Sequence, residues 1–431
     1  MRAARTSTPR GVLGSGLGVL LGFALWNLGN YAFFLLAGRI LGPHDYGLVA
    51  ALLAAALVIQ TPFMSFAGAL ARVVGGRADR GEGVYALALR RATVATVAAG
   101  VLAAAAILVA GAIDDRVATG PLLATLATLL PAAVLPLGFG QLQGEHDFRR
   151  FATGMASFGL PRPVALAVLA AAGLGIYAAL LGTAVTAFIA LAVVLGYTMR
   201  PARAAPADAS GEAWRDFSRS LLPFFVGIAA FSALTNVDVV VAKLALGGDD
   251  AGIFASAAVI AKSVLVIPQA IATIAIPRIA ARRSAGRPTS TLLAIQAGAT
   301  IAAGLVVTGV VAVLRDPLVT ITFGDEYADA AGLLVAFTAA MSLMGVVLIL
   351  LYHQLALGRY GYAWVLLGVA LLQVVLLAGF HGSADAIVAV DAIVAGVAVI
   401  AHEILPGRGG DRLWRGVAAE VRRYASRRDR R

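Results

Sequence analysis

Long apolar stretches, separated by short polar connections, recur along the whole 431-residue chain. A helix rises about 1.5 Å per residue, so about 20 apolar residues cross the roughly 30 Å hydrocarbon layer of a bilayer. The pattern therefore predicts an all-α polytopic membrane protein. The twelve expected transmembrane helices lie at residues 11–38, 47–71, 92–113, 120–141, 151–171, 176–199, 220–242, 250–277, 290–314, 328–350, 361–380 and 384–404.

Composition and charge distribution agree with this pattern. Hydrophobic residues make up 60% of the chain and charged residues 13%, against about 45–50% and 25% in an average soluble domain. When the N-terminus is taken as cytoplasmic, 28 of the 34 Lys and Arg residues fall on the inner side and four on the outer side. Basic residues favour the cytoplasmic side of a membrane, so both termini are expected to be cytoplasmic.

The net charge of +11 is therefore interpreted as a topology signal rather than as a sign of nucleic-acid binding. The basic tail after residue 404 carries nine arginines. We expect it to lie against anionic lipid of the bilayer, with no nucleic-acid partner.

An internal repeat predicts the domain organisation. Gly42 and Gly47 correspond to Gly247 and Gly252 at an offset of 205 residues. Six spans per half place both halves in the same orientation, so the repeat is expected to be parallel, with two six-helix lobes around a central cavity. The expected divisions are an N-terminal lobe at 1–199, a cytoplasmic linker at 200–219, a C-terminal lobe at 220–404 and a basic cytoplasmic tail at 405–431.

Several kinds of chemistry lack the residues they need. The chain has no cysteine, which excludes disulfides and thiolate metal sites. It has no phosphate-binding loop ending in Gly-Lys-Ser/Thr, and its five histidines are scattered. The loops expected outside are too short for a catalytic domain. We therefore expect no cofactor, no metal and no enzymatic activity.

Arg162 is the clearest candidate for substrate binding, because an ionisable group inside a span normally faces a bundle interior or a wet cavity. Pro161 and Pro163 flank it and remove backbone donors, which opens the helix. Arg162 either caps the freed carbonyl groups or lines the cavity. Asn27 and Asn30 of the first span are counted with the same candidate site.

Lys262, in the eighth span, is the second candidate cavity cation. A lysine can lose its proton when desolvated, so Lys262 is either a switchable charge or the partner of Asp238 in an ion pair. Asp238 and Asp391, in the seventh and twelfth spans, are the acids that could carry a coupling proton or Na⁺; each could equally be the partner of a buried cation.

Several motifs together resemble those of one family. They are Arg39-Ile-Leu-Gly-Pro-His-Asp-Tyr-Gly-Leu after the first span, Asp238 through Gly252-Ile-Phe-Ala-Ser-Ala, Ile276-Pro277-Arg278 and Phe323-Gly324-Asp325-Glu326-Tyr327. In their order and placement the chain resembles the polysaccharide-exporter flippases of the multidrug/oligosaccharidyl-lipid/polysaccharide superfamily.

The resemblance implies a function, a location and partners. The two lobes would move undecaprenyl-pyrophosphate-linked oligosaccharide from the cytoplasmic to the outer leaflet of the bacterial cytoplasmic (inner) membrane by alternating access. The positive charges of the cavity would bind the pyrophosphate, with Arg162 and Lys262 as candidates by position. A polysaccharide polymerase or glycosyltransferases would be partners.

Two other functions stay open at this stage. A cation-coupled multidrug exporter of the same superfamily is disfavoured, because the first span has Asn27 and Asn30 but no acid. A membrane glycosyltransferase or polysaccharide ligase would need acids and bases on a substantial outer loop, for which His44 and Asp45 are the only basis.

Overall fold

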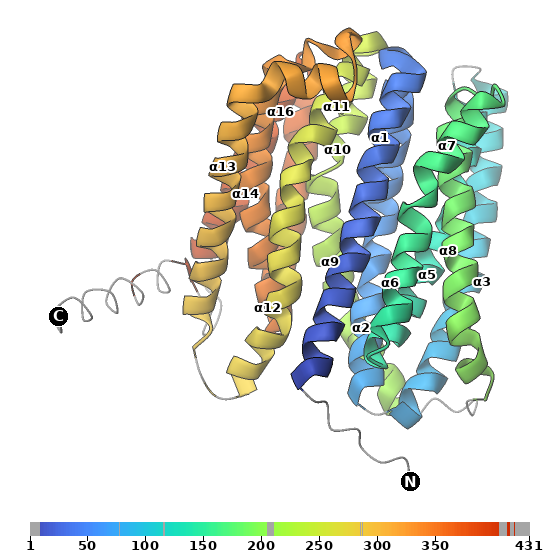
Figure 1. Cartoon of the computed structure of the whole chain (residues 1–431), viewed down its shortest axis with the longest axis vertical. Coiled ribbons are helices and arrows are strands. Elements are labelled where there is room, and N and C mark those ends of the chain that lie inside the picture. Colours follow the sequence, from blue (N-terminus) through green and yellow to red (C-terminus); the bar gives the residue numbers. More distant parts are fainter. Residues whose placement is uncertain are drawn as a thin grey trace. The chain divides into compact units, whose positions relative to one another are not determined.

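The computed structural model describes residues 9–76, 78–114, 117–204, 211–284, 286, 288–404, 412–413 and 418. These residues form helices and connections, and no strand occurs among them. The α-helices are α1 (Pro9–Gln60), α2 (Ser65–Gly76), α3 (Ala78–Ile113), α4 (Thr119–Leu126), α5 (Leu129–Gly144), α6 (Phe148–Gly159), α7 (Pro161–Ala171), α8 (Ile176–Ala204), α9 (Gly211–Leu234), α10 (Val237–Ala245), α11 (Gly248–Lys262), α12 (Val266–Ser284), α13 (Ser290–Thr322), α14 (Ala330–Ala356), α15 (Gly361–Gly379) and α16 (Ala384–Ile404), with short 3₁₀ helices η1 (Thr61–Met64), η2 (Ser263–Leu265) and η3 (Asp325–Tyr327) (Figure 1).

Eleven stretches of the described residues are long and apolar enough to cross a membrane. The first, Gly22–Val74, covers residues 22–38 of the first expected span and all of the second, because α1 is broken at Gly42, where φ is 70° and ψ is 171°. Glycine adopts such a conformation at no steric cost, which lets the chain turn there. The stretches thus overlap all twelve predicted spans, and the all-α, multi-pass membrane fold is confirmed.

The helices form two compact units. Unit 1 contains the residues up to Leu41 and Ile59–Phe225, and unit 2 contains Gly42–Val58 and the residues from Val226 onward. The segment Gly42–Val58, which the sequence places in the 1–199 lobe, thus packs with unit 2. The linker 200–219 is described except for 205–210, and most of the tail 405–431 lies outside the described residues. The parallel repeat and the central cavity stay predictions.

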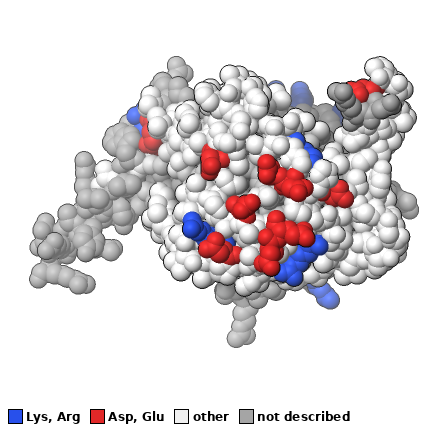
Figure 2. Space-filling view, turned by 90° about the horizontal axis from the view of Figure 1, so that it is seen from above, with Lys and Arg blue, Asp and Glu red and all other residues white. Residues whose placement is uncertain are grey.

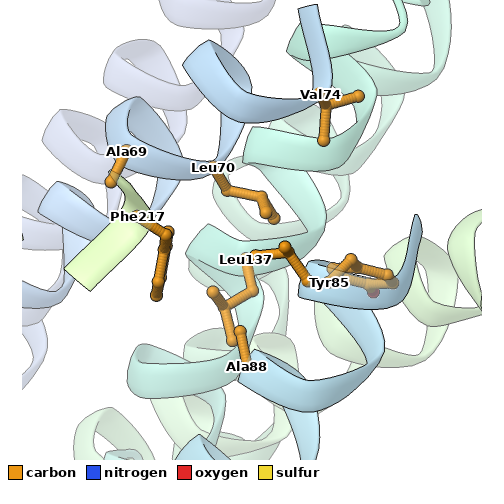
Figure 3. Close-up of a cluster of buried hydrophobic side chains, with 8 residues drawn as sticks. Ala69, Leu70, Val74, Tyr85, Ala88, Leu137 and Phe217 are labelled. Atoms are coloured by element: carbon orange, nitrogen blue, oxygen red, sulfur yellow. The ribbon is translucent and has the colours of Figure 1, made fainter. Parts of the chain in front are cut away.

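One core cluster of unit 1 forms where α2, α3, α5 and the start of α9 meet. Leu70, Ala88, Leu137 and Phe217 belong to this cluster of buried side chains (Figure 3). Tyr85 lies in the same cluster, and its hydroxyl is 2.6 Å from Thr198 Oγ1 of α8. Because a buried hydroxyl needs a hydrogen-bond partner, this contact links α3 to α8.

In unit 2, α14 is the central helix and packs against α11, α12, α13 and α16. Gly252 of α11 lies so close to Pro43 that a Cβ atom would be 1.9 Å from the Pro43 carbonyl oxygen. The ring of Tyr46 is 5.6 Å from that of Phe323 and 6.0 Å from that of Tyr327. The turn after Gly42 is therefore fixed to unit 2 by a glycine contact and an aromatic cluster.

The end of unit 2 around this turn is acidic. Its exposed acids include Asp45, Asp249, Asp250, Asp325 and Glu326, and Asp and Glu side chains gather on this face in Figure 2. Burial and, next, the negative charges of Glu326 and Asp249 raise the pKa of Tyr327 above its ordinary value. The hydroxyl of Tyr327 therefore stays neutral at physiological pH.

Candidate functional site

The break between α6 and α7 positions Arg162 inside its span. α6 ends at Gly159, and Pro161 is the first residue of α7, where its missing N–H leaves no donor unsatisfied. Arg162 follows as the second residue of α7 and is 6% exposed. The helical hydrogen bonding is interrupted at Pro161, while Leu160 keeps helical dihedral angles (φ −65°, ψ −41°), and the Arg162 side chain is buried within unit 1.

Glycines bring α1 against this break. A Cβ atom on Gly29 would lie 2.0 Å from the carbonyl oxygen of Gly159, and one on Gly159 would lie 2.7 Å from Cα of Trp26. Only glycine permits so close a backbone approach. The contact places Asn30, the next residue of α1, beside Arg162.

Uncharged groups surround the Arg162 guanidinium. Nη1 donates a hydrogen bond to Asn30 Oδ1, and Nε donates to Thr183 Oγ1 at 3.1 Å. The guanidinium carbon lies 3.8 Å from the ring centroid of Phe33, with the rings of Phe34 and Phe158 at 5.4 and 5.5 Å. No ion pair joins Arg162 to a carboxylate among the described residues.

Of the residues expected at this site, only some lie next to one another. Asn30 and Arg162 are in contact, whereas the Asn27 amide donates to Phe23 O of its own helix at 2.8 Å. The side-chain partners of Arg162 differ from the carbonyl groups considered as one alternative. Sequence reasoning missed Thr183 and Phe33, because no spacing rule connects spans one, five and six.

A second broken span, in unit 2, positions Asp238. α9 ends at Leu234, and α10 begins at Val237 after Thr235 and Asn236. Asp238 lies in the first turn of α10, where the partial positive charge of the helix N-terminus favours a carboxylate. Its side chain is fully buried.

Lys262 neutralises Asp238. The lysine Nζ is 2.9 Å from Oδ1 and 2.8 Å from Oδ2 of Asp238. Lys262 is in the last turn of α11, where the helix C-terminus favours a cation, and its side chain is 17% exposed. The ion pair, one of the two alternatives that the sequence left open, is therefore present.

Asp391 of α16 lies beside this ion pair. It is fully buried, and its carboxyl group is within electrostatic range of Lys262 and hydrogen-bonding range of Asp238. Gln373 of α15 donates to Asp391 Oδ1 at 2.9 Å and to Leu234 O at 3.1 Å. Gln373 thus binds a carbonyl group freed by the helix break as well as the acid, a role that the sequence did not assign to it.

His44 and Asp45, the residues considered for a glycosyltransferase or ligase, lie at the exposed acidic end of unit 2. His44 Nδ1 is 3.6 Å from Asp249 Oδ1, and both side chains are more than half exposed. Such an exposed pair contributes little to stability. No group of three or more acidic or histidine side chains fit to hold a metal ion occurs among the described residues.

Solved structures of transporters share this fold. The eukaryotic MATE transporter AtDTX14 has a TM-score of 0.68 at 16% identity, over 95% of this chain and 99% of that one. An inward-facing multidrug resistance MATE family transporter of the MOP superfamily has a TM-score of 0.66 at 17% identity, over 88% and 96%. A MOP superfamily transporter from Pyrococcus furiosus has a TM-score of 0.64 at 17% identity, over 89% and 92%.

The match to a protein family comes from the sequence and does not depend on the similarity in fold. No curated protein matches the chain. The family model described as polysaccharide biosynthesis protein matches residues 35–332, which is more than half of the chain. The chain therefore belongs to the polysaccharide biosynthesis protein family and has the fold of transporters of the MOP superfamily.

Proposed function

We propose that the protein is a flippase that moves polyprenyl-pyrophosphate-linked oligosaccharide from the cytoplasmic to the outer leaflet of the bacterial cytoplasmic membrane. Membership of a polysaccharide biosynthesis family and a transporter fold support this function. Both termini lie in the cytoplasm in this proposal. In this proposal glycosyltransferases act before the transport step, and a polysaccharide polymerase acts after it.

The buried, uncompensated charge of Arg162 is the observation that carries the proposal. A buried cation is unfavourable unless an anion pairs with it, and the described residues offer only uncharged partners. The N-terminus of α7 adds positive potential at the same place. An anionic group of the substrate supplies the missing partner.

Arg162 also keeps donors for such a group. A guanidinium has five N–H donors, and Asn30 and Thr183 accept two of them. The remaining N–H groups can bind phosphate oxygens through charge-assisted hydrogen bonds, for which the planar guanidinium is well suited. The Phe33 ring and the Asn30 amide hold the guanidinium in one orientation.

Asp238 and Asp391 carry the coupling ion in this proposal. Both acids are buried in unit 2, beside Lys262. Transport of an anionic lipid against its gradient requires an energy source, and a buried acid inside a membrane protein typically marks an ion pathway.

The second candidate function is cation-coupled multidrug export. The similarity to MATE structures and the buried acids of unit 2 favour it. The positive Arg162 site disfavours cationic drugs, because it would repel them. The Pyrococcus furiosus transporter is itself described as having a binding pocket of reverse polarity that suggests a different function.

A binding measurement tests the flippase proposal. Purified protein is titrated with farnesyl pyrophosphate, a soluble probe that carries the pyrophosphate group but no sugar. Loss of a hydrogen bond to a charged group weakens binding by about 1.5–3 kcal/mol, which is about 10- to 150-fold. Arg162→Ala should show this loss, whereas Arg72→Ala should not, because Arg72 also stacks on a ring, Phe224, but is exposed.

A cellular measurement complements the titration. Cells carrying Arg162→Ala should accumulate the lipid-linked oligosaccharide on the cytoplasmic leaflet, and cells carrying Arg72→Ala should export it normally. Normal export and unchanged affinity for the probe in Arg162→Ala contradict the proposal. Drug sensitivity of the same cells, with normal polysaccharide export, supports the multidrug alternative.

A further inference from the structure

The buried acids of unit 2 outnumber the cations that face them. Asp238 and Asp391 are fully buried, and Lys262 is the one cation in contact with them among the described residues. Both oxygens of Asp238 lie within 3 Å of the Lys262 ammonium. The charge of Asp391 is therefore not matched by a cation of the protein.

The hydrogen bonds of Asp391 are also incomplete. Gln373 donates to Oδ1, whereas Oδ2 is buried and has no hydrogen-bond partner among the described residues. The carboxyl group of Asp238 lies within hydrogen-bonding range. Two carboxylates in contact cannot both stay ionised, and a proton on one of them provides the donor for the other.

Lys262 excludes a metal cation from this site. Hard cations bind about six or more oxygen ligands in proteins. The lysine ammonium already binds both oxygens of Asp238, which leaves Asp391 Oδ2 and Gln373 Oε1 as buried oxygens without a partner. The Lys262 ammonium would also repel a second cation. A proton, in contrast, binds to a single carboxylate oxygen and needs no further oxygen ligands.

We infer that unit 2 contains a proton-binding site on Asp391, in which Lys262 is a resident cation that excludes Na⁺. The protonated carboxyl of Asp391 donates its O–H to the carboxylate of Asp238, which stays ionised beside Lys262. Release of the proton leaves a net charge of about −1 in the site, because two carboxylates then face one ammonium. This inference rests on the proposed transport function and names the ion that drives it.

The other titratable groups near these helices lie farther along them. Asp391 is flanked by α10, α14 and α15. On α15 the Tyr362 hydroxyl donates to Ala398 O, seven residues from Asp391, and on α14 His353 interacts with His402, eleven residues away. Those separations along α16 are about 10 Å and 16 Å. Asp238 and Lys262 are therefore the titratable groups that face Asp391 directly.

Infrared difference spectroscopy of purified protein without substrate tests the proton site. Wild type at neutral pH should show the carbonyl stretch of a buried, protonated carboxylic acid, and Asp391→Asn should lose that band. The matched control is Asp250→Asn, an exposed acid of the same unit whose substitution should leave the band unchanged. A band that survives in Asp391→Asn, or its absence in wild type, overturns the inference.

Binding of radioactive sodium ion tests the role of Lys262. Wild type should bind none saturably, and Lys262→Met, which removes the ammonium but keeps the apolar stem, should gain saturable, proton-competed binding. Lys262→Gln is the second variant if Lys262→Met does not fold. Saturable binding to wild type, or none to either folded variant, contradicts the inference. Because neither measurement uses the lipid-linked substrate, failure of the flippase proposal leaves the result unaffected.

Discussion

Arg162 in unit 1 and Asp238 in unit 2 occupy the same position in two broken spans. Each is the second residue of the helix that follows the break, α7 or α10. A helix N-terminus carries a partial positive charge. It therefore stabilises the Asp238 carboxylate and adds to the positive potential at Arg162.

The charges of Asp238 and Arg162 have different partners. Asp238 has a charged partner, Lys262, which comes from the favourable C-terminal turn of α11. Arg162 has an aromatic ring and two uncharged acceptors instead. The second position after the break therefore holds a closed ion pair in unit 2 and a positive charge without a charged partner among the described residues in unit 1. The first suits an internal switch, and the second suits binding of an anion from outside the protein.

Removal of the Asp238 charge should have the largest effect on stability. Asp238→Asn removes the carboxylate that contacts the Lys262 ammonium and leaves Asp391 as the one acid beside it. Breaking a buried pair on one side costs about 3–5 kcal/mol, and ionisation of Asp391 offsets part of this cost. We expect a lower midpoint of thermal unfolding in detergent and lower abundance in the membrane. Asp249→Asn is the control, because Asp249 is 68% exposed.

The double variant Asp238→Asn with Lys262→Met sharpens this test. It removes both charges, so it should be more stable than Asp238→Asn alone. A double variant that is less stable than either single variant would show that the two residues act independently.

The sequence predicts the spans and the opening at Pro161, but it predicts neither the break before Asp238 nor the partners across the two breaks. Apolar length and proline positions depend on neighbouring residues, so the twelve spans and the opening at Pro161 could be predicted. The contacts of Arg162 with Asn30 and Thr183 join residues 132 and 21 positions apart. The membership of Gly42–Val58 in unit 2 is likewise a tertiary contact, because Gly252 admits the Pro43 backbone.

Gly29→Ala should have the next largest effect on stability, because it disrupts the surroundings of Arg162. The added methyl group would lie 2.0 Å from a backbone oxygen of Gly159, so α1 and α6 must separate and Asn30 must move away from Arg162. Overpacking costs about 1–3 kcal/mol, and backbone contact places this case near 3. Gly100→Ala, in the same unit with open space at its Cβ, should be neutral in the same unfolding assay.

Asn30→Ala should have an intermediate effect. It removes an acceptor from a buried guanidinium, a loss of about 1.5–3 kcal/mol. Asn27→Ala, one turn earlier, removes only a bond to Phe23 O within its own helix, worth about 0.5–1.5 kcal/mol. The difference should appear in thermal unfolding and in affinity for farnesyl pyrophosphate. Equal losses in the two variants would show that Asn30 does not position Arg162.

The two lysines of the chain give the smallest and most direct comparison. Lys243 lies 3.5 Å from His44 O at the acidic end of unit 2, whereas Lys262, whose side chain is 17% exposed, is held in its ion pair with Asp238. Lys243→Met should change stability by less than about 1 kcal/mol, as for other exposed charges. An amine-reactive reagent that does not cross membranes should label Lys243 on intact cells, and mass spectrometry should find Lys262 unmodified. Label on Lys262, or none on Lys243, would show that the acidic end does not face outside or that the ion pair is open to water.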